Sequence, residues 1–186
     1  MRAIFSTLLF GSVLVLNAGC SGAPKSVHIG TTELAVSLED WEGIRNLAHE
    51  GDIYFGGQPD EETLRRMKDE LGIKLVVNLR ADSEMTRVDF DEPALAAELD
   101  MEYCSIPVSP DAFSASDIQK FVESLNKVEG PLLIHCASSN RVGGFWASYL
   151  VLEKDVEIED ALEHGRAAGL RAGAMTDAAI KVFSEH

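Results

Sequence analysis

Residues 130–144, GPLLIHCASSNRVGG, decide how the fold is assigned. The apolar run at 131–135 predicts a buried strand, and the residues from 142 to 152 predict a buried helix directly after it. The short loop from Cys136 to Arg141 joins the two. In sheets of parallel strands, ligands bind at this carboxyl end of the strand.

The chain around this stretch alternates between strand and helix patterns. Apolar runs predict further strands over residues 53–55, 74–79 and 102–108. Helices are predicted over 60–71, at Pro93, and over 116–128, 158–168 and 176–184. Strands that alternate with helices predict an α/β fold, with a mostly parallel central sheet and helices on both faces.

The charge balance excludes one large class of partner. The chain has 16 Lys and Arg against 31 Asp and Glu, for a net charge of −15. Nucleic acid is not an expected partner, because its phosphates need a basic surface. Any anion site must therefore be locally positive. The histidines are scattered and show no metal-ligand spacing, so neither a metal nor a cofactor is expected.

The N-terminus predicts export. Residues 1–20 hold one charge, Arg2, then an apolar run and small residues before Cys20, as in a secretory signal. The ending LNAGC resembles a bacterial lipoprotein signal, which implies a lipidated Cys20, a membrane anchor and a periplasmic location. Asn17 stands where such signals usually carry an aliphatic residue, so an ordinary signal peptide is the alternative. Residues 21–38 are predicted to be a tether and 39–186 a single domain.

The loop itself predicts anion chemistry. Backbone N–H groups between a strand and a helix N-terminus bind anions and favour a thiolate at Cys136. Arg141 can bind an oxyanion at two points. The alternative is that Cys136 is a buried thiol that packs as a small hydrophobic residue.

The loop and two further segments resemble a known superfamily. With GGQPDEETLRRMKDELGIKLVVNLR at 56–80 and YCSIPV at 103–108, the sequence is similar to the cysteine-dependent protein tyrosine and dual-specificity phosphatases. It most resembles a bacterial branch named for phosphatases fused to NAD kinase-like or beta-lactamase-hydrolase-like domains, with loops of the HCxSGxR type. The resemblance covers roughly residues 40–170.

The resemblance implies a phosphatase that acts on a phosphorylated protein or a small phosphate ester. Cys136 would be the nucleophile that forms a cysteinyl-phosphate, and Arg141 would bind the phosphate. The loop residues between them would supply backbone donors: Ala137, Ser138, Ser139 and Asn140. His135 would support the loop through hydrogen bonds.

Asp111 is the candidate general acid by the same resemblance, because it follows the predicted strand at 102–108. An aspartate after proline is also ordinary turn chemistry, so that alternative stays open. Asp117 is expected to favour the start of the next helix.

Three departures from the superfamily pattern matter. Four residues separate Cys136 from Arg141, where most of these phosphatases have five; four is typical of rhodaneses, which transfer sulfur through a cysteine persulfide. Ser139 replaces a glycine and is strained if that position needs positive φ. Val142 replaces a Ser or Thr that assists thiolate departure, so slow hydrolysis of the phosphocysteine is expected.

Two alternative functions follow from these departures, namely a sulfurtransferase and a non-catalytic anion-binding module. Two further residues have open roles. Cys104 is either a core thiol or a disulfide partner of Cys136. Arg80 either adds positive charge at the site or pairs with Asp82 or Glu84 at the surface.

Overall fold

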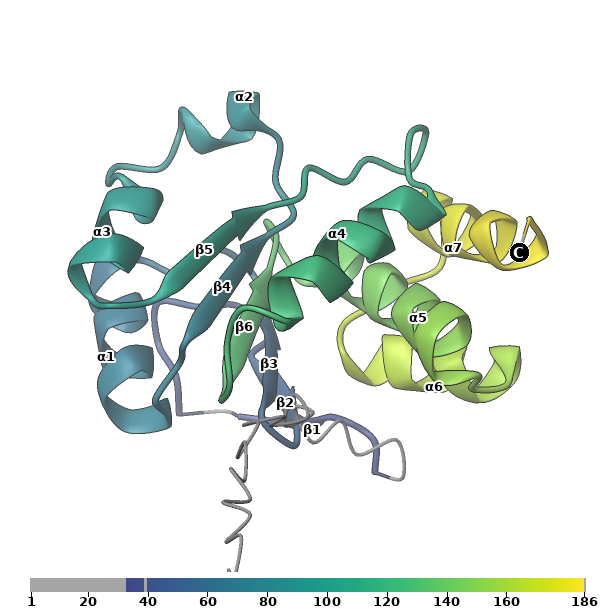
Figure 1. Cartoon of the computed structure of the whole chain (residues 1–186), viewed down its shortest axis with the longest axis horizontal. Coiled ribbons are helices and arrows are strands. Elements are labelled where there is room, and N and C mark those ends of the chain that lie inside the picture. The colour runs from purple at the N-terminus through teal and green to yellow at the C-terminus, as the bar shows by residue number, and fades with distance from the viewer. Residues whose placement is uncertain (1–32, 39, 186) are drawn as a thin grey trace, which may run out of the picture.

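We describe the protein from a computed structural model, over residues 33–38 and 40–185 (Figure 1). The predicted signal at 1–20, with Cys20, and most of the predicted tether lie outside the described residues. The last part of that tether belongs to the sheet, because β1 (Val36–Ser37) pairs antiparallel with β2 (Ala48–Glu50).

The centre of the protein is a six-stranded sheet in the order β1-β2-β3-β6-β4-β5. Its strands β3, β6, β4 and β5 run parallel, and β1 and β2 extend one edge in antiparallel fashion. The bounds of the parallel strands are Ile53–Gly56 for β3, Leu75–Asn78 for β4, Glu102–Ser105 for β5 and Leu132–His135 for β6. The predicted mostly parallel sheet is confirmed.

Strand β4 shows how the sheet acquires two buried faces. All its residues are buried, as expected for a continuous apolar run. Because successive side chains point to opposite faces, Leu75 and Val77 join the larger apolar core, whereas Val76 joins the smaller one.

Helices cover both faces of the sheet, as predicted. Helices α1 and α3 pack on the side of the smaller core, and α4 to α7 lie on the other side (Figure 1). The helix bounds are α1 Glu61–Leu71, α2 Asp82–Met85, α3 Glu92–Glu98, α4 Ala115–Leu125, α5 Asn140–Lys154, α6 Ile158–Ala167 and α7 Ala174–Ser184. The short helix α2 and strand β2 had no counterpart in the sequence analysis.

Local side chains set where the helices begin and end. The Asp60 carboxylate accepts a hydrogen bond from the Thr63 N–H, and Gly72 ends α1 in the left-handed conformation. Asp117 accepts from the Ser114 N–H at 3.1 Å, so it supports the start of α4 as expected. Helix α4 ends at Leu125, three residues before the predicted end, because the chain tightens into a turn in which the Lys127 N–H bonds the Ser124 carbonyl.

Strand β5 is shorter than the predicted strand at 102–108. After Ser105 the chain still follows β4, since the Ile106 N–H bonds the Asn78 carbonyl and the Val108 N–H bonds the Leu79 carbonyl. These bonds lead the chain along the carboxyl edge of the sheet toward α4. Within residues 33–38 and 40–185, no helix is both long and apolar enough to cross a bilayer.

Candidate active site

The loop after β6 lies at the middle of the carboxyl edge of the sheet, as predicted. Strand β6 runs between β3 and β4. The Cys136 N–H donates to the Gly56 carbonyl at 3.2 Å, and the Leu79 N–H donates to the His135 carbonyl at 2.9 Å. Both neighbouring strands therefore fix the start of the loop.

The backbone N–H groups at the start of α5 are available to a ligand. Ser138 pairs with Gly57 in an isolated antiparallel bridge, whereas the N–H groups of Asn140, Arg141 and Val142 lie in the first turn of α5, where the helix itself supplies no acceptor. The first bond of the helical ladder runs from the Gly143 N–H to the Ser139 carbonyl, at 3.0 Å. Consecutive donors at a helix N-terminus form a site for an anion.

Cys136 lies at the base of the loop, and 1% of the residue is exposed. It contacts the larger apolar core. Burial alone would lower the pKa of Arg141, but hydrogen bonds with Glu84 and the neighbouring Cys136 raise that pKa above its usual value. The sulfur is thus buried and lies beside the guanidinium group, so its burial does not separate it from the anion site.

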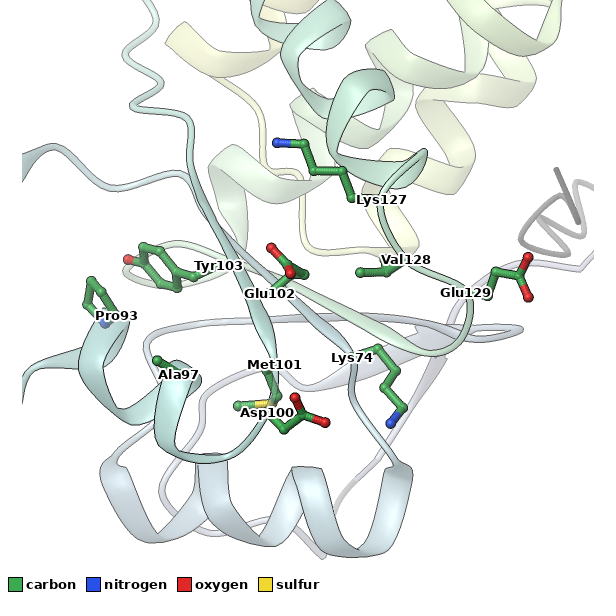
Figure 2. A pocket seen from close by; sticks show the side chains of 10 residues that line it. All are labelled: Lys74, Pro93, Ala97, Asp100, Met101, Glu102, Tyr103, Lys127, Val128 and Glu129. Atoms are coloured by element: carbon green, nitrogen blue, oxygen red, sulfur yellow. The ribbon is translucent and has the colours of Figure 1, made fainter.

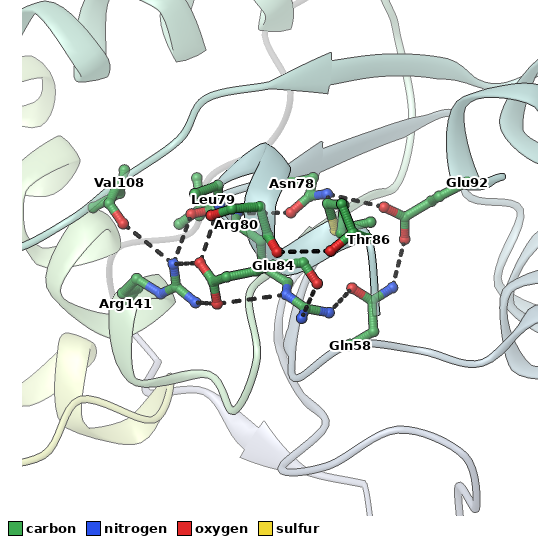
Figure 3. Close-up of polar contacts among 12 residues, drawn as sticks. Gln58, Asn78, Leu79, Arg80, Glu84, Thr86, Glu92, Val108 and Arg141 are labelled. Carbon is green, nitrogen blue, oxygen red and sulfur yellow. Dashed lines mark hydrogen bonds and ion pairs between the residues drawn. The ribbon is translucent and has the colours of Figure 1, made fainter. Parts of the chain in front are cut away.

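Glu84, on α2, holds the guanidinium of Arg141 in place (Figure 3). Both Nη atoms donate to its carboxylate, each at 2.7 Å, and Nη1 also lies 3.3 Å from the carbonyls of Leu79 and Val108. These hydrogen bonds lower the pKa of Glu84 to about 2. The bonds to Glu84 use Nη1 and Nη2 and do not involve Nε.

A network of polar side chains continues from Glu84 behind the loop (Figure 3). Arg80 is 9% exposed, and its Nη1 donates to Gln58 at 2.6 Å while its Nη2 donates to the Glu84 carbonyl. The expected pairing of Arg80 with Glu84 occurs, at 3.7 Å, but in a buried position and not at the surface.

The network ends at His135. Gln58 donates to Glu92 at 3.0 Å, and the same carboxylate oxygen lies 3.2 Å from His135 Nε2. Burial would raise the pKa of Glu92, but the contacts with His135 and Tyr103 hold it below its usual value. Contacts between side chains therefore link both ends of the loop, Arg141 and His135.

Ser139 has the left-handed conformation in which a glycine was expected, with φ of 67°. Its fully buried hydroxyl donates to the Ala168 carbonyl at 2.7 Å. Gly169 follows Ala168 in the chain, and a Cβ added to Gly169 would lie 2.7 Å from the Cβ of Ser139. The strain predicted for Ser139 is therefore present, and a hydrogen bond and a neighbouring glycine accommodate the larger side chain.

Two residues that the sequence analysis did not identify hold the outer side of the loop. Asn46 donates to the Ser138 carbonyl at 3.1 Å, and Arg171 donates to the same carbonyl at 3.0 Å and to the Ser138 hydroxyl at 2.9 Å. The backbone N–H of Arg171 also donates to the Asn140 side chain at 2.7 Å. The segment after α6 thus fixes the conformation of the loop.

Asp111 lies exposed in the segment between β5 and α4. Its side chain makes no hydrogen bond with a described residue, and its role stays a prediction. The same segment reaches the site through the Val108 carbonyl, which contacts Arg141. Val142 is fully buried, so the loop is followed by an apolar side chain, as its sequence indicated.

Cys104 does not pair with Cys136, and both are free thiols. On β5, Cys104 lies opposite Val77 of β4, which lies opposite Ile134 of β6. Two strand spacings are roughly 10 Å, too far for a disulfide. The disulfide alternative is therefore wrong, and Cys104 is a partly buried thiol packed against the core, where burial raises its pKa.

Comparisons with known proteins agree with this geometry. A family model described as "DSP-PTPase phosphatase fused to NAD+ Kinase" matches residues 25–181. A "Beta-lactamase hydrolase-like protein" of Xylella fastidiosa is 27% identical over 123 residues, which are 65% of this chain but 28% of that protein. The chain thus spans little more than a quarter of this curated relative.

Solved structures show the same fold. TpbA of P. aeruginosa superposes with a TM-score of 0.63 at 22% identity, over 82% of this chain and 90% of that one. A putative phosphatase (DUF442) of Shewanella putrefaciens gives a TM-score of 0.61 at 22% identity, over 77% and 94%. The chain belongs to the family of DSP-PTPase phosphatases described as fused to NAD+ kinase.

Proposed function

We propose that the protein hydrolyses phosphate monoesters through a cysteinyl-phosphate on Cys136. In the first step the thiolate of Cys136 attacks phosphorus and the bond from phosphorus to the ester oxygen breaks. The leaving oxygen takes a proton from Asp111. In the second step the Asp111 carboxylate takes a proton from water while the water oxygen attacks phosphorus, the S–P bond breaks, and inorganic phosphate leaves with the thiolate and the Asp111 acid restored.

The observation that carries this proposal is the first turn of α5, whose N–H groups precede the first bond of the helical ladder, beside the guanidinium of Arg141. A transferred phosphoryl group needs donors for its oxygens and a positive charge close by. Glu84 accepts from both Nη atoms of Arg141 and does not use Nε. This arrangement supports phosphate binding without displacement of Glu84.

Phosphotyrosine is the substrate side chain that we propose for the first tests. A cysteine-to-serine variant of TpbA has been solved in complex with pTyr, and superposes on this chain with a TM-score of 0.56 at 19% identity. We also propose that the protein is exported and anchored through Cys20, which rests on the signal-like residues 1–20.

The test is hydrolysis of an aryl phosphate by the full chain under reducing conditions, beside Cys136→Ser and the matched control Cys104→Ser. We expect Cys136→Ser to abolish turnover and Cys104→Ser to retain it. Rapid acid quenching and mass spectrometry should find phosphate on Cys136. Equal rates in the wild type and Cys136→Ser would refute the nucleophile.

The spacing of four residues between Cys136 and Arg141 does not by itself favour sulfur transfer, because loops of the HCxSGxR type have the same spacing. An assay with thiosulfate and cyanide still separates the two chemistries. Thiocyanate formation without phosphate release would establish the sulfurtransferase. Phosphate binding that Arg141→Ala abolishes, with neither product formed, would indicate a non-catalytic anion-binding module.

A further inference from the structure

A cavity lies beside the loop that joins β6 to α5, where two of its lining residues contact Ser138. Its volume is about 270 Å³, and it is lined by Arg166, Arg171 and Asn46 together with small and apolar residues, but by no carboxylate. Asn46 and Arg171 are the residues that donate to Ser138 of the loop. The cavity therefore adjoins the loop at Ser138.

Its charge sets it apart from the other cavities that we describe. The cavity at the opposite edge of the sheet, of about 550 Å³, is lined by Lys74 and Lys127 but also by Asp100, Glu102 and Glu129 (Figure 2). Two further cavities are each lined by at least three acidic residues. In a chain with a net charge of −15, a cavity with arginine and no carboxylate is the one that suits an anion.

The two arginines are available for a ligand. Neither Arg166 nor Arg171 forms an ion pair with any acidic residue of the described chain. Arg166 makes no side-chain hydrogen bond there either, whereas Arg171 uses Nη2 for Ser138 and leaves its other nitrogens. A basic side chain in the last turn of a helix interacts favourably with the helix dipole, which explains the position of Arg166 in α6. Arg171 lies beyond the end of α6, so this interaction does not explain its position.

The cavity is close enough to serve the same substrate molecule. Ser138 is two residues from Cys136, a span of at most about 7 Å, and Arg171 Nη2 lies 3.0 Å from the Ser138 carbonyl. We propose that this cavity binds a second phosphate group of a substrate whose first phosphate is cleaved at Cys136. This inference rests on the proposed function and narrows the substrate to a molecule with two phosphates roughly 10 Å apart or less.

The test compares hydroquinone bisphosphate with phenyl phosphate as substrates of the full chain. A bisphosphate has two cleavable groups, which alone raises kcat/KM by a factor of about two. We expect the wild type to prefer it by about tenfold or more, since a phosphate oxygen bound to a guanidinium is a charged hydrogen bond. Arg166→Gln should reduce this preference to the statistical value, and 0.5 M salt should weaken it.

Lys74→Gln is the matched control, because it removes the same charge at the opposite edge of the sheet, in the cavity of Figure 2. It should keep the wild-type preference. Thermal melting followed by circular dichroism checks that each variant is folded. A preference in Arg166→Gln equal to that of the wild type would overturn the proposal.

A binding measurement separates this proposal from the proposed function. Calorimetry with Cys136→Ser should show binding of the bisphosphate that is tighter than binding of the monophosphate by more than the statistical factor of about two, and Arg166→Gln in that background should reduce the difference to that factor. If the wild type hydrolyses neither ester but this binding difference is present, the catalytic proposal fails and the second anion site stands. A difference in binding no larger than this statistical factor would refute the second site.

Discussion

Substitution of Glu84 by glutamine tests how the phosphate-binding arginine is positioned. The carboxylate of Glu84 accepts from both Nη atoms of Arg141 at 2.7 Å, and glutamine keeps the shape but has one oxygen and no charge. The guanidinium of Arg141, 17% exposed, would lose one of its two carboxylate bonds. We therefore expect Arg141 to be held less firmly beside the loop, by the remaining bond and the contacts with the Leu79 and Val108 carbonyls.

The expected loss of unfolding free energy in Glu84→Gln follows from the ion pair between Glu84 and Arg141. The pKa of Glu84 falls from its ordinary 4.5 to about 2 in the folded protein, which corresponds to at most about 3.4 kcal/mol of unfolding free energy. Because 33% of the side chain is exposed, solvent screening reduces this to about 1–2 kcal/mol. We also expect a loss of kcat/KM between about tenfold and hundredfold, as for other misplaced catalytic groups.

The pH dependence gives a sharper measurement. A carboxyl group with a lowered pKa in the folded state stabilises the protein above its unfolded pKa, and this stabilisation disappears as the pH falls from about 4.5 toward 2. Urea denaturation should therefore show wild type and Glu84→Gln differing by a constant amount above pH 5 and converging below it. Asp82→Asn, an equal change of charge at an exposed position of α2, is the control for the loss of one negative charge from this helix.

Kinetics decide between two roles for Glu84. If Glu84 positions Arg141, then Glu84→Gln should bind inorganic phosphate more weakly and turn over more slowly. If this variant instead binds phosphate more tightly with unchanged or faster turnover, Glu84 competes with the substrate and our reasoning is wrong.

Three further predictions concern the loop and its neighbours. Ser139→Ala should lower the unfolding free energy by about 1–2 kcal/mol in urea denaturation, because the Ala168 carbonyl loses its donor while the left-handed φ remains; Ser139→Gly should cost less, and the reverse order would contradict the account of strain. Gly169→Ala should lower the unfolding free energy by more than about 2 kcal/mol in the same assay, because the added Cβ would meet Ser139 and φ is +110°. Combining it with Ser139→Gly should restore part of this loss. Full additivity of the two changes in unfolding free energy would argue against the contact. Val142→Thr should raise the steady-state rate without changing the initial burst in stopped-flow hydrolysis of an aryl phosphate, because a hydroxyl there would assist departure of the thiolate; an unchanged steady-state rate would refute this role.

Regular apolar patterns made the sheet and most helices predictable. Residues 74–79 are apolar in nearly every position because β4 is buried on both faces, and the helix at 60–71 has a capping aspartate and a terminal glycine. Strand β2 was missed because its three residues, AHE, include Glu50, which is buried. Its carboxylate accepts from Trp146 and His164, contacts that arise only in the folded chain.

The nucleophile loop was predictable because its chemistry is contained in one short segment. The residues that orient it were not, because Glu84 is 57 residues from Arg141 and lies on a helix of four residues without a pattern of its own. One signal was present: Asn78 is a polar residue inside an apolar strand, and it donates to Glu92 of the same network. A polar residue in a buried strand indicates that another polar side chain is present to form a hydrogen bond with it.

The distance between Cys104 and Cys136 has a consequence for how an oxidised Cys136 is reduced again. Oxidation of Cys136 to a sulfenic acid is commonly reversed when a nearby resolving thiol forms a disulfide with it. Cys104 is too far away for this, because it lies on β5, whereas Cys136 follows β6. Strand β4 lies between these two strands and is hydrogen-bonded to both. Recovery of the oxidised enzyme must therefore depend on a reductant supplied from outside the folded domain.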